Sequence, residues 1–116
     1  DETMTETTEY TPDDFMIGAP VTARATIKSG EAFPARTPLM MDATDAATLV
    51  KWDGTPGKAV AMSARDVVNT GSDQLSTVYP QGGFRIGFVN WPDTVTTDKQ
   101  KRAAFIGSAV YVDDEY

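Results

Sequence analysis

The stretch that decides the fold is "LSTVYPQGGFRIGFVNW", residues 75–91. After its centre, large apolar residues recur at every second position, as in a strand with one buried face. Pro80 sets φ for a type I turn, and Gly82 can adopt the left-handed conformation that follows such a turn. The stretch therefore predicts a β-hairpin with strands at 75–79 and 84–91.

Outward from this hairpin, apolar runs bounded by Pro, Gly and Asp predict further short strands. These lie at residues 21–28, 39–41, 48–52, 58–63 and 108–112. The strand at 58–63 follows a Gly/Pro turn, so we expect it to pair back on the strand at 48–52.

One helix is predicted, at residues 98–106. Thr97 is suited to its N-cap, Gln100 stands at the capping-box position, and Gly107 can end it. Together the elements predict an α+β fold. The expected form is a small mixed domain at 15–116 with short antiparallel strands, one short helix and extensive loops, preceded by an extended N-terminal arm.

Charge sets that arm, residues 1–14, apart from the rest of the chain. It holds six acidic side chains, no basic one and five threonines, whereas residues 15–112 are nearly neutral. Such a segment has too little apolar mass to fold alone, but its alternating threonines favour extended backbone beside a partner strand. A body without a basic face argues against nucleic-acid binding.

The 116-residue chain contains neither Cys nor His, which removes disulfides and the most common catalytic and zinc-binding side chains. No apolar run is long enough to span a bilayer, and no export signal opens the chain, so we expect a soluble protein without a membrane partner. Asp42 and Asp45 lack the ligand spacing of a calcium loop and are interpreted as turn residues. No metal or cofactor site is therefore expected.

Trp52 and Trp91 stand at the ends of predicted strands, where large amphipathic rings usually pack in a core or at a subunit contact. Two functional alternatives stay open at this point. An exposed pair of tryptophans would suit a ligand-binding module that recognises host glycans. A hydrolase would need Asp42 and Asp53 to converge in a cleft.

Several blocks, in this order and spacing, resemble one known family. They are "TPLMMD", "LVKWDGT", "GGFRI", "NWPD" and "KQKRAAFIGSAVYV", within residues 37–112. In these blocks the chain is similar to the head decoration proteins of bacteriophage lambda and its relatives, the capsid cement protein D family. The stretch 63–74, the acidic arm and the acidic C-terminal end depart from the family pattern.

The resemblance implies a non-enzymatic structural protein without cofactors. Family members form homotrimers on the outer surface of the expanded icosahedral head, bind the major capsid protein and reinforce the shell against packaged DNA. The implied location is the virion, after assembly in the host cytoplasm.

The arm is the expected capsid-binding element, by strand addition to an edge of the capsid protein. The residues assigned to this contact are Thr3, Thr5, Thr7, Tyr10, Pro12, Phe15 and Met16. Trp52 and Trp91 are assigned to the core or to the trimer interface.

Overall fold

Strands dominate the computed structural model, which describes residues 15–68 and 71–114. The strands are β1 (Val21–Ile27), β2 (Pro38–Met41), β3 (Leu49–Lys51), β4 (Ala61–Ser63), β5 (Gln74–Arg85) and β6 (Ala109–Asp113). A single 3-10 turn, η2 (Ile86–Phe88), and a single α-helix, α1 (Asp98–Ala103), complete the regular structure of this part of the chain.

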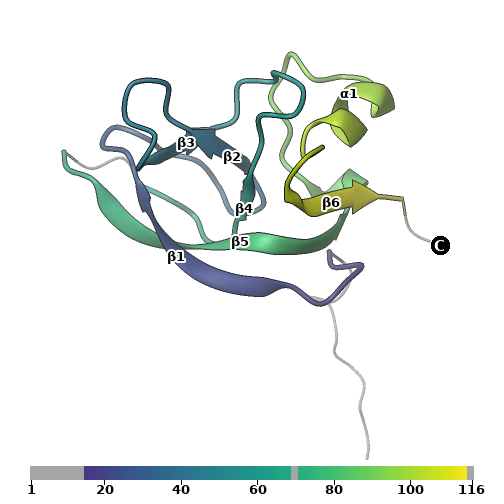
Figure 1. Cartoon of the computed structure of the whole chain (residues 1–116), viewed down its shortest axis with the longest axis horizontal. Coiled ribbons are helices and arrows are strands. Elements are labelled where there is room, and N and C mark those ends of the chain that lie inside the picture. The colour runs from purple at the N-terminus through teal and green to yellow at the C-terminus, as the bar shows by residue number, and fades with distance from the viewer. Residues whose placement is uncertain (1–14, 69–70, 115–116) are drawn as a thin grey trace, which may run out of the picture.

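Five of the strands close into a barrel. The hydrogen-bonded order is β1-β3-β2-β4-β5, and β5 pairs again with β1, while β6 lies outside this ring on β5. Figure 1 shows β1 and β5 as a long twisted ribbon, with β2, β3 and β4 above it and α1 near β6. The expected α+β class is therefore wrong: the protein is a small β-rich domain, because the six-residue helix is an addition to a sheet that closes on itself.

The predicted hairpin is also wrong, because β5 runs without a turn from Gln74 to Arg85. Val21 pairs with Gln81 and Ala23 with Val78, so three steps on β5 oppose two on β1. This β-bulge accommodates Pro80, which cannot donate to a ladder. Beyond Arg85 the chain turns into η2, so the predicted strand at 84–91 ends early.

Strand β4 does not pair with β3 as expected. Leu39 of β2 pairs with both Lys51 of β3 and Ala61 of β4, so β2 lies between them. The other edge of β4 bonds to β5, where Met62 faces Tyr79. The Gly/Pro turn between β3 and β4 predicts a hairpin, but such a local signal carries no information about β2. In the fold β2 lies between the two strands, so they cannot pair with each other.

Two apolar cores lie on opposite faces of β4 and the middle of β5. Neighbouring residues alternate between them, as the two-residue period of a strand requires: Ala61 and Val78 face one core, Met62 and Tyr79 the other. The first core fills the barrel with Ile27, Phe33, Leu39, Ala61, Val67 and Val78. All three residues of β4 are buried because both faces are covered.

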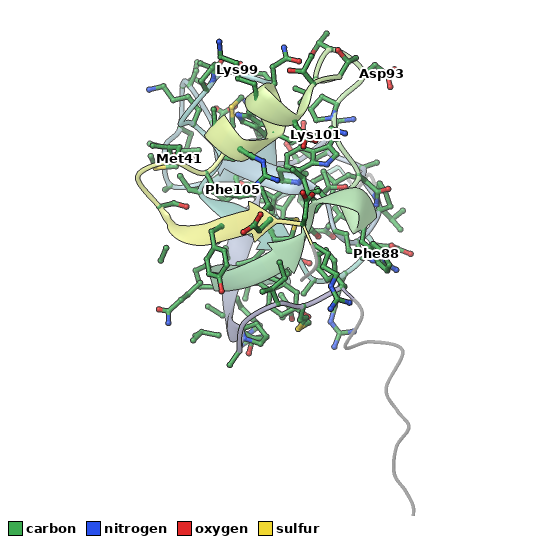
Figure 2. All side chains as sticks on the ribbon, turned by 90° about the vertical axis from the view of Figure 1, so that its right-hand side faces the viewer. Met41, Phe88, Asp93, Lys99, Lys101 and Phe105 are labelled. Carbon is green, nitrogen blue, oxygen red and sulfur yellow. The ribbon has the colours of Figure 1, made fainter. Side chains whose placement is uncertain are left out.

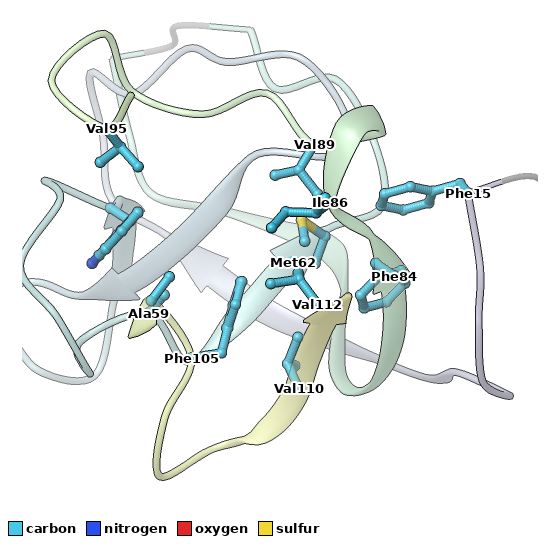
Figure 3. Close-up of a cluster of buried hydrophobic side chains, with 12 residues drawn as sticks. Phe15, Ala59, Met62, Phe84, Ile86, Val89, Val95, Phe105, Val110 and Val112 are labelled. Atoms are coloured by element: carbon cyan, nitrogen blue, oxygen red, sulfur yellow. The ribbon is translucent and has the colours of Figure 1, made fainter. Parts of the chain in front are cut away.

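The second core lies between the barrel wall and the C-terminal third of the chain (Figure 3). It contains Phe15, Trp52, Ala59, Met62, Phe84, Ile86, Val89, Val95, Ala104, Phe105, Val110 and Val112. Most of these residues follow the bulge in β5, so the uninterrupted course of β5 carries the chain from one core to the other.

Helix α1 begins as the sequence predicts. The Gln100 amide N–H donates to the Thr97 hydroxyl, and the Thr97 amide N–H donates to the Gln100 side-chain oxygen, which is a complete capping box. The helix ends at Ala103, earlier than predicted, and the following turns lead to Gly107 with φ of 95°.

Candidate functional site

The base of the N-terminal arm is built into the sheet. The Arg85 amide N–H donates to the Phe15 carbonyl at 2.7 Å, and the Ile17 amide N–H donates to the Gly83 carbonyl at 2.8 Å. Met16 forms an antiparallel bridge with Phe84 between these bonds. Residues 15–17 thus occupy one edge of β5, while β6 occupies the other edge of the same stretch.

Phe15 fastens this base to the second core. Its side chain is 7% exposed and stacks on Phe84, with ring centroids 4.7 Å apart. The Arg36 guanidinium lies over the Phe15 ring, 5.3 Å from its centroid. Arg36 holds a left-handed backbone, φ 66°, and no local sequence signal places it beside residue 15.

Of the predicted capsid-binding residues, the structure describes only Phe15 and Met16. Phe15 is buried and Met16 is half-buried against the second core. Thr3, Thr5, Thr7, Tyr10 and Pro12 lie outside the described residues. The structure therefore describes where the arm departs from the domain.

Trp52 and Trp91 meet edge to face, with ring centroids 6.1 Å apart. Trp52 is 2% exposed, and its indole N–H donates to the Thr55 carbonyl; the Trp91 indole N–H donates to the Ile86 carbonyl. Both rings therefore serve the packing of the second core. The groove beside them, about 310 Å³, is also lined by Pro34, Thr37, Lys51, Asn90, Pro92 and Asp93.

The tryptophan geometry does not favour the glycan-binding alternative. Stacking on a sugar requires an accessible ring face. The buried Trp52 offers none, so the two rings do not form an exposed platform.

Asp42 and Asp53 do not converge. They follow β2 and β3, which are antiparallel, so they lie at opposite ends of this strand pair. Hydrogen bonds from the Thr44 hydroxyl and the Asp45 amide lower the pKa of Asp42 well below its usual range. The Thr55 amide likewise lowers the pKa of Asp53. Both carboxylates keep their charge and stabilise turns, which gives the hydrolase alternative no support.

Within residues 15–68 and 71–114, no three His, Cys, Asp or Glu side chains are grouped so that they could hold a metal ion. No helix in the described part of the chain has the length and apolar character needed to cross a membrane.

The acidic C-terminal end is partly tied to the domain. Arg102 of α1 donates to Asp113 at 2.7 Å and to Asp114 at 3.0 Å, and lies 3.8 Å from Asp98. The hydrogen bond from Arg102 lowers the pKa of Asp113. Asp113 and Asp114 belong to the acidic C-terminal end of the sequence. Their ion pairs with Arg102 attach the end of β6 to α1.

Exposed apolar side chains are distributed around the domain. They are Val21, Met41, Val68, Leu75, Phe88, Ile106 and Tyr111. Met41 and Phe88 lie on opposite sides of the view in Figure 2. Lys99 and Asp93 lie near the top of that view.

The fold and this site define a small β-barrel domain in which polar and charged groups stabilise turns and residues 15–17 are bonded along the edge of β5. Residues 3–111 match the family model described as bacteriophage lambda head decoration protein D. The chain is also 43% identical, over 82 residues, to a protein of Escherichia phage N15 described as a decoration protein; the match covers 68% of this chain and 70% of that relative.

The chain belongs to the family of bacteriophage lambda head decoration proteins. The resemblance found in its sequence blocks is thereby confirmed. Members of this family are structural rather than enzymatic, and the protein is a component of a phage capsid.

Proposed function

We propose that the protein binds as a homotrimer to the outer surface of the expanded icosahedral head, after assembly in the host cytoplasm, and stabilises the shell against the pressure of packaged DNA. Its direct partner is the major capsid protein, and the arm is the main attachment element. The observation that carries the proposal is the position of residues 15–17, hydrogen-bonded along the edge of β5 at the point where the arm departs.

Strand addition explains how a polar arm contributes affinity. Ordering the backbone costs about 1–2 kcal/mol per residue, so main-chain hydrogen bonds along most of the arm must offset that cost. The threonines at positions 3, 5 and 7 favour this extended form. The six acidic side chains require a basic or amide-rich groove on the capsid protein, and binding that weakens as the salt concentration rises.

Trimer formation is supported by the exposure of β1. Residues Val21–Arg24 are all exposed, so both faces of this end of β1 are open. A stable strand normally has one covered face. Val21 itself is 46% exposed. A neighbouring subunit packed on this end of the β1–β5 ribbon would supply the missing cover, and a domain of this size gains burial most readily by association.

A trimer also explains reinforcement without strong individual contacts. Three equivalent arms engage the shell, so after the first has bound, the others bind at high effective concentration. One trimer then bridges adjacent capsid subunits and resists their separation.

The decisive experiment compares the full chain with a variant lacking residues 1–14 on expanded heads purified without this protein. We expect the truncated variant to keep its fold and oligomeric state in sedimentation, and to lose most of its attachment to heads. Equal attachment of both proteins would refute the role of the arm.

Stabilisation is tested separately on DNA-filled heads. Decorated heads should retain DNA to a higher temperature, or at a lower concentration of stabilising cations, than undecorated heads. Equal retention would refute reinforcement, and a dimer in sedimentation both with and without heads would refute the trimer.

A further inference from the structure

Tyr111 of β6 lies across two other segments of the sheet. It is the register partner of Gly83 on β5, and a side chain at Gly83 would overlap its ring. The ring extends beyond β5 to residue 18, where a Cβ atom on Gly18 would lie 2.5 Å from the Tyr111 hydroxyl oxygen. One aromatic side chain thus covers β6, β5 and the segment that follows the arm.

Neither glycine is required by its backbone conformation. Gly18 and Gly83 are absent from the glycines with positive φ, which are Gly30, Gly54, Gly57, Gly82 and Gly107. Their backbones suit other residues, and only the Tyr111 ring excludes a side chain. Glycine within a strand commonly marks such a close approach, and an aromatic neighbour can compensate for its missing side chain.

The ring lies beside two of the hydrogen bonds that hold the base of the arm. The amide N–H groups of Ile17 and Gly18 both donate to the Gly83 carbonyl, at 2.8 and 3.3 Å. Successive side chains on a strand point to opposite faces, so Phe84 and the Tyr111–Gly83 contact lie on opposite faces of β5. Phe15 stacks on Phe84 on the core face, and Tyr111 covers Gly18 and Gly83 on the other face.

We propose that Tyr111 is a positioning residue that clamps the base of the arm to the sheet and so fixes the direction in which the arm reaches the capsid. The proposal rests on the proposed attachment role of the arm. Tyr111 remains 50% exposed and is not part of either core, so its packing serves the contact with Gly18 and Gly83. A fixed base lowers the entropy lost when the arm binds.

Hydrogen exchange on the free protein tests the clamp without any capsid. In Tyr111→Ala we expect the Ile17 and Arg85 amides to exchange at least about tenfold faster, because local opening of this edge becomes easier. The Val60 amide, which donates to the Leu39 carbonyl in the barrel, is the internal reference and should not change. Tyr111→Phe keeps the ring and removes only the hydroxyl group nearest to residue 18, so its exchange should lie closer to the parent protein than to Tyr111→Ala. Unchanged exchange at Ile17 in Tyr111→Ala would overturn the clamp.

A double-mutant cycle keeps the test valid if one variant folds poorly. Gly83→Ala should disturb the Ile17 amide in the parent protein, because the added methyl group displaces the ring, but should have little effect in the Tyr111→Ala background. Equal effects of Gly83→Ala in both backgrounds would overturn the proposed contact.

Attachment to expanded heads distinguishes the clamp from the arm itself. We expect Tyr111→Ala to bind about tenfold more weakly, as a loss of preorganisation predicts, and Tyr111→Phe to bind nearly as tightly as the parent protein. If deletion of residues 1–14 abolishes attachment while Tyr111→Ala binds normally, the positioning role is wrong and the proposed function stands. If the deletion leaves attachment intact, the proposed attachment role of the arm fails, whatever the exchange result.

Discussion

Phe15 and Phe84 stack with their ring centroids 4.7 Å apart, and this contact joins the base of the arm to β5, the longest strand in the described part of the chain. Because β5 pairs with β1, β4 and β6, a residue fastened to β5 is fastened to the whole sheet. Tension on the arm would therefore pass through this pair into the barrel.

Phe15→Ala should destabilise the domain by about 3 kcal/mol, since it removes a buried ring and leaves a cavity beside Phe84. Urea denaturation monitored by tryptophan fluorescence measures this loss. Phe88→Ala is the matched control: Phe88 is 44% exposed, so its removal should cost less than about 1 kcal/mol. Equal costs for the two variants would show that Phe15 does not fasten the arm to the core.

Gly82→Ala should cost about 1–3 kcal/mol, because Gly82 has φ of 143° and a Cβ atom there would lie 3.0 Å from the Pro20 Cα atom. Gly87→Ala is the control, since nothing lies within 4 Å of the position that its Cβ atom would occupy. Thermal unfolding compares the two. A tolerated Gly82→Ala would contradict the close approach of residues 18–20 to the bulged strand.

Thr97→Ala should destabilise α1 by about 1 kcal/mol through loss of the capping box. Thr96→Ala serves as the control, because the hydrogen bond from residue 96 to Gln100 uses the backbone N–H and survives the change. Amide exchange at Lys101, which donates to the Thr97 carbonyl, reports the effect locally. Identical exchange in both variants would argue against the cap.

Arg102→Gln should raise the pKa of Asp113 toward its ordinary value of 3.8, because the Arg102 hydrogen bond is the main cause of its lowered pKa. A carboxyl group with a lowered folded pKa stabilises the fold above its unfolded pKa, and this contribution is lost as the pH falls through the folded pKa. In the parent protein, the contact between β6 and α1 should therefore loosen below pH 3.8.

Carboxyl carbon shifts measured by NMR during an acid titration follow Asp113 directly. High salt should reduce the difference in Asp113 pKa between the parent protein and Arg102→Gln, because the Arg102 and Asp113 side chains are exposed. If the titration midpoint does not move in Arg102→Gln, the ion pair does not form in solution.

Features that depend on residues close together in the chain were determined by the sequence alone. The capping box needs only Thr97 and Gln100, three positions apart, and both the cap and the start of α1 are confirmed. The strands at β1, β2, β3 and β6 lie within or beside the apolar runs that predict them. Family membership was also predictable from the sequence, because the order and spacing of short sequence blocks can be recognised without knowing which strands pair.

Tertiary structure alone decided what depends on distant partners. The segment Pro80-Gln81-Gly82-Gly83 has the local chemistry of a turn, but pairing with β1 and β6 keeps it within a bulged, continuous β5. Barrel closure follows from that strand, and so do the places of Arg36 over Phe15 and of Tyr111 over Gly18. The reason is physical: backbone preferences act within a few residues, whereas ladder bonds and ring contacts join segments that only the folded chain brings together.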